Sequence, residues 1–353
     1  MKKHYNFLIL ILLMPFLAFS NNFDFISKQK TIKKTYIVNS NAGIDIENKY
    51  GDITVTTWDE DKIDLDITIK VTGKNENWVN ERLNSITVDI NALKSMVSAV
   101  TSLGSSSIMS KGSNNSFEIN YVIKIPKNGT VKLSNKYGNI VTGDLVSTTD
   151  IFCKYGKIGL GKLNGNNNMV HIEYCQNSSI EYIKGGTIEA RYSGLKVTDA
   201  GKINLDTNYT DLVVVGGQSI KYDCNYGKFK FEKIGSVAGS GNYITVNVGE
   251  LLNSLSADLT YSKLNVGVIN EKANTITVTS EYSDVSLGYD TNFAFDFDIN
   301  TRYGNIRNDG SLDISVSESK NSTKKINGFY KKRGQNKIAV NSNYGSVTLT
   351  RKQ

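Results

Sequence analysis

A short phrase centred on tyrosine recurs along this chain, and it limits the possible fold more than any other feature. Its clearest copies are NKYGDITV (48–55), NKYGNIVT (135–142), CKYGKIGL (153–160), CNYGKFKF (224–231) and SNYGSVTL (342–349). The same place in the phrase is held by Tyr50, Tyr137, Tyr155, Tyr174, Tyr192, Tyr209, Tyr226, Tyr243, Tyr261, Tyr282, Tyr303 and Tyr344. From Tyr137 to Tyr303 the steps are 17–21 residues. A unit of that length cannot bury an apolar face alone, so the units must stack on one another.

Alternation within a unit indicates which side chains face inward. The residue four before the tyrosine is apolar, as at Ile151 and Leu205, and the residue two before it is mostly small. The residue one before it is polar, as at Lys154. After the tyrosine a Gly, Ser or Thr usually precedes another apolar position. We therefore expect a strand, a tight corner and a second strand in every unit. The tyrosine shares the parity of the apolar positions before it, which predicts an inward-facing ring.

These units predict an all-β protein, specifically a single-stranded parallel β-helix, or β-solenoid, of about a dozen coils of 17–21 residues. Successive coils would lie one inter-strand spacing apart, about 4.8 Å, and so form a rod. The handedness of parallel crossover connections predicts right-handed winding. The abundance of Asn, Thr, Ser, Gly, Val, Ile and Tyr suits strands joined by tight turns.

The chain is predicted to begin with a signal peptide over residues 1–20. Two lysines precede an apolar stretch, and Ala18-Phe19-Ser20 supplies small residues for cleavage. No later stretch has the ~20 apolar residues that a membrane span needs. We therefore expect an exported protein, in the periplasm or at the cell surface, with no transmembrane segment in the mature chain.

Two interruptions divide the repeats. Residues 21–125 are predicted to form N-terminal coils with a capping insertion near 75–116, made of a short helix and a mobile Ser/Gly/Asn-rich loop. Residues 126–353 are predicted to form the solenoid repeats, with a charged loop insertion near 317–335. A cap at the end of the rod would protect the open sheet edge from other chains.

Charge and cysteine content exclude some classes of function. Beyond residue 20 the chain has 39 basic and 34 acidic residues, a net charge of +5, and the basic residues are scattered. A nucleic-acid partner is therefore not expected. Three cysteines at unpaired spacing, Cys153, Cys175 and Cys224, fit small core positions better than a disulfide framework.

No catalytic, cofactor or metal site is predicted, and the protein is expected not to be an enzyme. His171 is the single histidine beyond the leader and falls on an outward strand position, which suits a surface residue. A polysaccharide-active β-helix, lyase-like, is the alternative, because some parallel β-helices cleave acidic polysaccharides with aspartates. Asp52, Asp211 and Asp284 lie near corners, but many coils apart, which favours solvated turns.

Three segments resemble a bacterial adhesin family that includes auto-transporter adhesins with a head GIN domain. They are YGDITVTTWDED (50–61), YVIKIPKNGTVKLSNKYGNI (121–140) and NGFYKKRGQNKIAVNSNYGSVTL (327–349). The shared motif is a structural corner between strands. The resemblance implies a β-strand repeat fold, a cell-envelope setting and an adhesive role. The chain departs from an auto-transporter in ending at Arg351-Lys352-Gln353 directly after a coil.

Two side-chain ladders are the candidate sites. The first is the tyrosine series Tyr137, Tyr155, Tyr174, Tyr192, Tyr209, Tyr226, Tyr243 and Tyr261, which we interpret as a structural ladder, with a glycan-facing surface as the alternative. The second is a polar ladder of Asn208, Asn225 and Asn242 in three consecutive coils, predicted to form hydrogen bonds along the rod.

Together these features predict a non-enzymatic envelope protein that presents a solenoid surface to an envelope protein or a glycan. The alternatives are the polysaccharide-active β-helix and a self-associating architectural rod.

Overall fold

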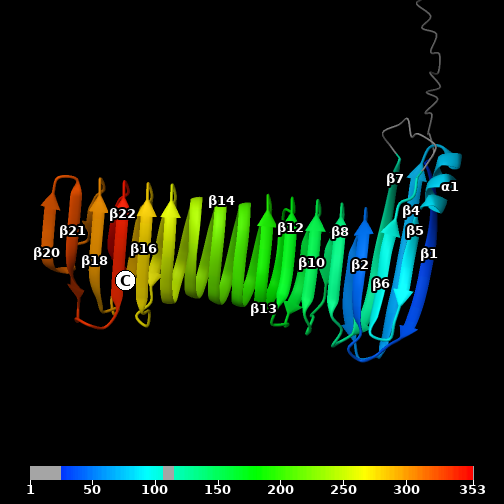
Figure 1. Cartoon of the computed structure of the whole chain (residues 1–353), viewed down its shortest axis with the longest axis horizontal. Coiled ribbons are helices and arrows are strands. Elements are labelled where there is room, and N and C mark those ends of the chain that lie inside the picture. The colour runs from blue at the N-terminus through cyan, green and yellow to red at the C-terminus, as the bar shows by residue number, and fades with distance from the viewer. Residues whose placement is uncertain (1–24, 106–114, 353) are drawn as a thin grey trace, which may run out of the picture.

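The computed structural model describes residues 25–105 and 115–352. They form an elongated molecule of strands laid side by side, with one short helix at one end (Figure 1). All strands in these ranges belong to one mixed, largely parallel sheet of 23 strands. The all-β prediction is confirmed. The predicted signal peptide and most of the predicted mobile loop lie outside the described residues.

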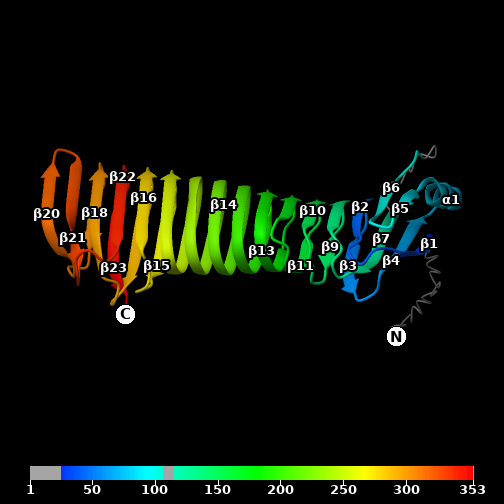
Figure 2. The ribbon, with the colours of Figure 1, turned by 60° about the horizontal axis from the view of Figure 1, so that its bottom comes forward.

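The middle of the molecule consists of strands that follow one another in space as they do in the chain (Figures 1 and 2). These strands are β8 (Val131–Lys136), β9 (Ile140–Thr142), β10 (Thr149–Lys154), β11 (Ile158–Leu163), β12 (Asn168–Glu173), β13 (Ser178–Arg191), β14 (Gly194–Thr260), β15 (Lys263–Ile269), β16 (Thr275–Glu281) and β17 (Asp284–Asp290). β14 runs through several successive units and pairs in parallel with β13, β15 and β16 (Figure 1).

We call the strand before each repeat tyrosine the first strand of its unit, and the strand after it the second strand. First strands pair in parallel with first strands, as β10 does with β8 and β12. Second strands pair with second strands, as β11 does with β9 and β13. The molecule therefore has two sheet faces joined at the tyrosine corners.

Stacking in register produces the core. The position four before the tyrosine forms one continuous line of partners, running Leu133, Ile151, Val170, Ile188 and Leu205. All five side chains are buried. Full burial of such a side chain contributes about 1.5–3 kcal/mol relative to exposure. The predicted inward column is therefore the interior of the molecule, and each unit supplies only one layer of it.

The N-terminal end is built differently. It contains β1 (Ile26–Ile37), β2 (Gly43–Lys49), β3 (Ile53–Trp58), β4 (Lys62–Gly73), α1 (Glu76–Ser85), β5 (Thr87–Ala92), β6 (Met96–Ser102) and β7 (Ser116–Pro126). β1, β4 and β7 pair antiparallel and extend the second-strand face, because β7 pairs with β3. β5 and β6 extend the first-strand face beside β2.

The predicted short helix is present as α1 at this end (Figure 1). The Asn75 side chain accepts a hydrogen bond from the backbone N–H of Trp78 at 3.0 Å, which caps the first turn. Trp78 and Val79 are buried, and the helix packs on β1 and β4. Its ten residues are too few to cross a bilayer, and the described ranges hold no helix that could.

The C-terminal end changes the order of the units. It contains β18 (Phe295–Arg302), β19 (Ile306–Asn308), β20 (Asp313–Lys320), β21 (Thr323–Tyr330), β22 (Lys337–Asn343) and β23 (Val347–Lys352). β22 lies between β16 and β18, and β23 lies between β17 and β19. The last unit of the chain is therefore inserted between the two units that precede it in sequence.

The loop predicted near 317–335 is largely a β-hairpin instead. β20 and β21 pair antiparallel, and β21 pairs antiparallel with β18 at the end of the sheet (Figure 1). The reason is the alternation within β21. Its residues Ile326, Gly328 and Tyr330 are buried beside β18, whereas Lys324 and Lys325 stay outside the core. The many charged residues of this segment indicated a loop, although every second residue at its end is buried.

Candidate functional site

The repeat tyrosines form one unbroken stack, which we call the tyrosine column. In spatial order it runs Tyr50, Tyr137, Tyr155, Tyr174, Tyr192, Tyr209, Tyr226, Tyr243, Tyr261, Tyr282, Tyr344 and Tyr303. Neighbouring ring centroids are 4.6–5.1 Å apart, and neighbouring planes lie within 15° of parallel. The column thus joins units from both ends of the described chain.

The prediction that these rings face inward is wrong. Every tyrosine of the column is 37–52% exposed. Each has a positive φ, between 47° and 61°, in the left-handed region. This conformation turns the chain at the tyrosine, so the alternation that holds along the first strand does not continue through the corner. The ring therefore points out to solvent although its parity matches the buried residues.

Stability alone does not explain why tyrosine occupies every corner. A left-handed conformation costs a non-glycine residue about 1–2 kcal/mol, whereas glycine adopts it freely and asparagine readily. An offset-stacked ring pair contributes about 0.5–1.5 kcal/mol beyond its burial. The two terms are of similar size, so stacking roughly offsets the strain. What tyrosine adds beyond that balance is the surface it presents, a ridge of aromatic rings and hydroxyl groups.

Behind the tyrosine column lies a second column, formed by the residue that follows each tyrosine. In the first units it is glycine, because a Cβ on Gly138 would lie 1.9 Å from the carbonyl oxygen of Gly51. Four later units carry a hydroxyl side chain at this position, namely Ser193, Thr210, Ser262 and Ser283. Ser283 Oγ accepts a hydrogen bond from the N–H of Ser262 at 2.8 Å and donates one to the carbonyl of Glu281 at 2.7 Å. Ser193 makes the equivalent pair of bonds. Where they occur, these hydroxyls join a corner to the neighbouring corner and help to hold the tyrosines in register.

Cations flank the tyrosine column. Lys154 Nζ lies 5.4 and 5.6 Å from the ring centroids of Tyr155 and Tyr174, and it forms a 2.6 Å ion pair with Glu173. The hydrogen bond from Lys154 holds the pKa of Glu173 below its usual range. At the other end the pKa of Tyr303 is lowered by a hydrogen bond with Ser322 and by the nearby Arg302 guanidinium. Attraction between a cation and an aromatic face holds these side chains against the exposed rings.

The predicted asparagine ladder does not form as a hydrogen-bonded chain. Asn208, Asn225 and Asn242 do precede three successive tyrosines of the column. The Oδ1 atoms of Asn208 and Asn242 are buried and have no hydrogen-bond partner. These two oxygens therefore do not stabilise the rod through hydrogen bonds between units.

The other candidate residues lie apart from the tyrosine surface or serve packing. His171 is half-buried on a first strand, with Nε2 3.1 Å from Glu173 and Nδ1 3.5 Å from Glu189. The Asp52 carboxylate accepts the N–H of Asn139 at 2.8 Å, and that of Asp284 accepts the N–H of Ser346 at 3.0 Å. These aspartates join neighbouring corners. Across residues 25–105 and 115–352, no group of three His, Cys, Asp or Glu side chains is arranged to hold a metal ion.

The cysteines are free and buried, as expected for core positions. Cys175 Sγ lies 3.3 Å from the carbonyl oxygen of Cys153, in the neighbouring unit. A hydrogen bond between the two thiols raises the pKa of Cys153 and lowers that of Cys175. Because neither side chain reaches solvent, this contact serves packing rather than surface chemistry.

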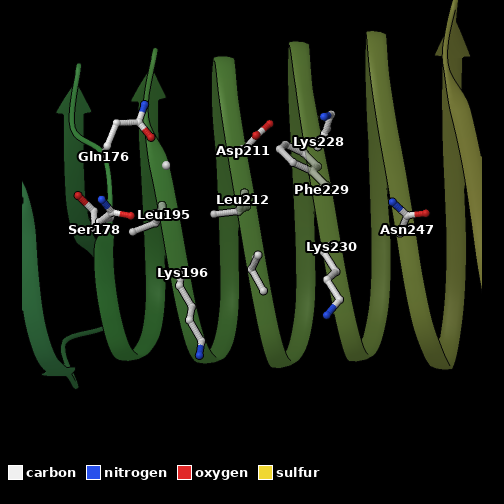
Figure 3. Close-up of a pocket in the computed structure, with 13 residues that line it drawn as sticks. Gln176, Ser178, Leu195, Lys196, Asp211, Leu212, Lys228, Phe229, Lys230 and Asn247 are labelled. Carbon is white, nitrogen blue, oxygen red and sulfur yellow. The ribbon is translucent and has the colours of Figure 1, made fainter.

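Sequence reasoning missed a shallow depression on the second-strand face. It has a volume of about 550 Å³ and is lined by residues that follow Tyr174, Tyr192, Tyr209, Tyr226 and Tyr243, among them Gln176, Lys196, Asp211 and Lys228 (Figure 3). Glycine at 194, in a column that carries Gln176, Asp211 and Lys228 in the neighbouring units, is the sequence signal that could have indicated it.

Comparison with known proteins gives no family assignment: no family model matches the chain, and no curated protein matches it. Three solved structures are similar over 92% of this chain. A "putative cell adhesion protein" from Clostridium sporogenes is 13% identical with a TM-score of 0.18, and the match covers 100% of it. "Putative adhesins" from Bacteroides fragilis and Parabacteroides distasonis are 13% and 12% identical, with TM-scores of 0.23 and 0.25, and the matches cover 97% of each. Likeness at this level says nothing about activity.

Proposed function

We propose that this chain is an exported, non-enzymatic envelope protein that binds a glycan or an envelope protein through its tyrosine column. Its fold in this proposal is a right-handed, single-stranded parallel β-solenoid, with residues 1–20 as a signal peptide. The observation that carries the proposal is the exposure of twelve stacked tyrosines in a backbone conformation that costs each of them energy. Tyrosine and arginine are enriched at binding surfaces, and exposed aromatic surface of this extent marks interaction sites.

The geometry indicates how a partner would make contact. Each ring face inside the column is partly covered by the neighbouring ring, so a ligand would meet ring edges, the uncovered part of the faces and the phenol hydroxyls. Centroids at 4.6–5.1 Å are farther apart than carbon–carbon contact at about 3.5–4.0 Å, so touching rings must be slipped sideways. A partner with a matching repeat along the column would gain many weak contacts at once.

A binding screen tests this proposal. The purified chain is exposed to an array of glycans and to an extract of bacterial envelope proteins, in parallel with a Tyr209→Asn/Tyr226→Asn variant. Asparagine tolerates the left-handed conformation, so the fold should survive the loss of both rings. Tyr182→Ala is the matched control, because Tyr182 lies on a second strand outside the column.

Saturable binding by the chain and the control, with loss in the folded double variant, is the expected result. Binding that the double variant retains would move the site away from the column. Absence of binding in every arm would reject the proposal.

Self-association is a second candidate function, favoured by one observation. Among the described residues β20 is an edge strand that pairs with β21 alone, and all eight of its side chains are exposed. Such an edge presents unpaired backbone groups to another strand. Sedimentation velocity over a hundredfold range of concentration tests it: a monomer throughout would reject the architectural-rod alternative. Release of unsaturated uronic acid from glycans would instead support the lyase-like alternative.

A further inference from the structure

The depression on the second-strand face is hollowed by two local departures from the repeat. Asn177 is an extra residue with φ 55°, and beyond it the register places Ser178 opposite Leu195. The small, buried Ser178 thus stands in line with a leucine. In the next unit Gly194 has no side chain, between Gln176 and Asp211 of the flanking units. The result is a hollow with apolar residues beneath it and polar side chains around it (Figure 3).

The rim of the hollow is mainly basic. Lys196, Lys228 and Lys230 line it, and Asp211 is the one acidic residue among its lining side chains. Lys230 forms a 2.7 Å ion pair with Glu232. Neither Lys196 nor Lys228 takes part in any of the ion pairs of the described residues. Lys230, helped by Lys196, lowers the pKa of Glu232, but Lys196 forms no ion pair with that carboxylate, so the ammonium groups of Lys196 and Lys228 can both pair with a ligand. The amides of Asn177 and Asn247 add hydrogen-bonding groups that suit a polar, uncharged part of the same ligand.

The distance between successive units of the rod favours an anionic glycan over an acidic peptide as the linear ligand. An extended peptide advances about 3.3 Å per residue, so side chains on one of its faces recur about every 6.6 Å. The units here recur with the tyrosine ring spacing of 4.6–5.1 Å. That distance is close to the length of one pyranose ring with its glycosidic oxygen in an extended chain. A linear glycan therefore keeps step with successive units, whereas a peptide strand does not.

We propose that this hollow binds a linear anionic glycan whose chain runs along the rod beside the tyrosine column, with one uronate carboxylate at Lys196 and another, farther along the sugar chain, at Lys228. The inference rests on the proposed function. In four successive units the residues that line the hollow begin two positions after the repeat tyrosine, so a ligand in the hollow lies beside the tyrosine column. It names the ligand class and adds a second set of contacts. Charge attraction to exposed lysines also makes the binding weaken as salt concentration rises.

Isothermal titration with three probes of equal length tests the inference: β-1,4-linked oligomannuronate, neutral β-1,4-linked oligomannose and oligoglutamate. The uronate should bind most tightly. Lys196→Gln/Lys228→Gln should weaken its binding roughly tenfold or more, since each charge-assisted hydrogen bond is lost. Lys202→Gln/Lys272→Gln removes the same charge at exposed sites outside the hollow and should leave binding nearly unchanged.

Gly194→Leu provides a test that keeps every charge. A Cβ at Gly194 would lie 2.6 Å from Oε1 of the flexible Gln176 side chain and at ordinary contact distance, 3.8 Å, from the backbone nitrogen of Asn177, so the fold should accept the change while the hollow is filled. Loss of uronate binding in this variant supports the hollow as the site.

Equal binding of oligomannose would overturn the anionic preference, and equal binding of oligoglutamate would overturn the glycan assignment. No binding of any probe, together with tyrosine-dependent binding in the envelope screen, would reject this inference and leave the proposed function standing.

Discussion

In the middle of the molecule, from β8 to β17, the order of the units in space is their order in the chain, whereas at the C-terminal end it is not. There the last unit, β22 and β23, separates β16 and β17 from β18 and β19. At the N-terminal end the chain order is also broken: β2 lies between β6 and β8, and β7 lies between β3 and β4, while α1 packs on β1 and β4. The comparison teaches that stacking requires matching layers and not neighbouring sequence, because every unit offers the same inward column and the same tyrosine corner to its neighbours.

Breaking the inserted unit should have the largest effect. Val340 is fully buried and lies between Val278 and Ile299, so Val340→Asp places an unpaired charge between the middle and the C-terminal end. We expect a loss of about 4 kcal/mol or more in the free energy of unfolding. In hydrogen exchange, amides of β18 and β21 should lose protection together with β22, while β12 and β13 keep theirs.

Asn341→Asp is the matched control for that substitution, because Asn341 is the exposed neighbour of Val340. It should change stability by less than about 0.5 kcal/mol. If β18 kept its protection in Val340→Asp, the insertion of the last unit would be refuted.

The hydroxyl column should show the next largest effect. Ser283→Ala leaves the N–H of Ser262 without its partner, at the unit that adjoins the inserted one. Loss of that hydrogen bond should cost about 1–3 kcal/mol in urea unfolding. Ser286→Ala, three residues away and outside the column, should be nearly neutral. Equal effects of the two substitutions would show that the hydroxyl does not hold the corner.

Tyrosines in the middle and at the end of the column should differ by one ring contact. Tyr209 stacks on Tyr192 and Tyr226, whereas Tyr303 stacks on Tyr344 alone. Alanine at 209 should therefore destabilise the fold more than alanine at 303, by about 0.5–1.5 kcal/mol. Glycine at either position should be more stable than alanine by about 1 kcal/mol, because it relieves the left-handed strain. Thermal unfolding of the four variants measures both differences, and alanine as stable as glycine would contradict the strain.

The Lys154–Glu173 pair in the middle should show the smallest effect, visible in its pH dependence. The pKa of Glu173 is lowered in the folded state by the hydrogen bond from Lys154. The pair's contribution is therefore present above the unfolded pKa, near 4.3, and is lost as pH falls through the folded pKa. Lys154→Gln should lose less stability than the unsubstituted chain when pH is lowered from 6 to 2. If the free energy of unfolding fell equally in both proteins between pH 6 and pH 2, the pair would have no role in stability.

The sequence predicted the interior of the molecule well because the inward positions repeat. Leu133, Ile151, Val170, Ile188 and Leu205 were assigned to one column from alternation, and they are partners in register in the structure. Burial of apolar side chains on a pleated strand follows a period of two, so it can be counted along the chain. The outward position of His171 and the burial of Cys153 and Cys224, each two residues before a repeat tyrosine, agree with the same count.

The candidate surface could be predicted only in part. The sequence indicated that tyrosines recur, but the direction of each ring depends on the positive φ of the tyrosine itself. Counting alternate residues along the chain cannot reveal such a left-handed turn. The hollow beside Gly194 depends on the contact of units 17–18 residues apart with different side chains, which no single unit contains. The asparagine ladder failed for a related reason, since adjacency in neighbouring units does not guarantee hydrogen-bond geometry.

By itself, then, the sequence determined that this chain is a stack of strand–corner–strand units with a buried apolar column and a tyrosine at every corner. These properties are local, repeated and set by side-chain chemistry within one unit. Only the tertiary structure decided that the rings are exposed, that the last unit lies between two earlier ones, and that lysines gather around a hollow on the second-strand face. Those properties arise between units, where backbone conformation at the corners and the meeting of layers distant in sequence determine what each side chain contacts.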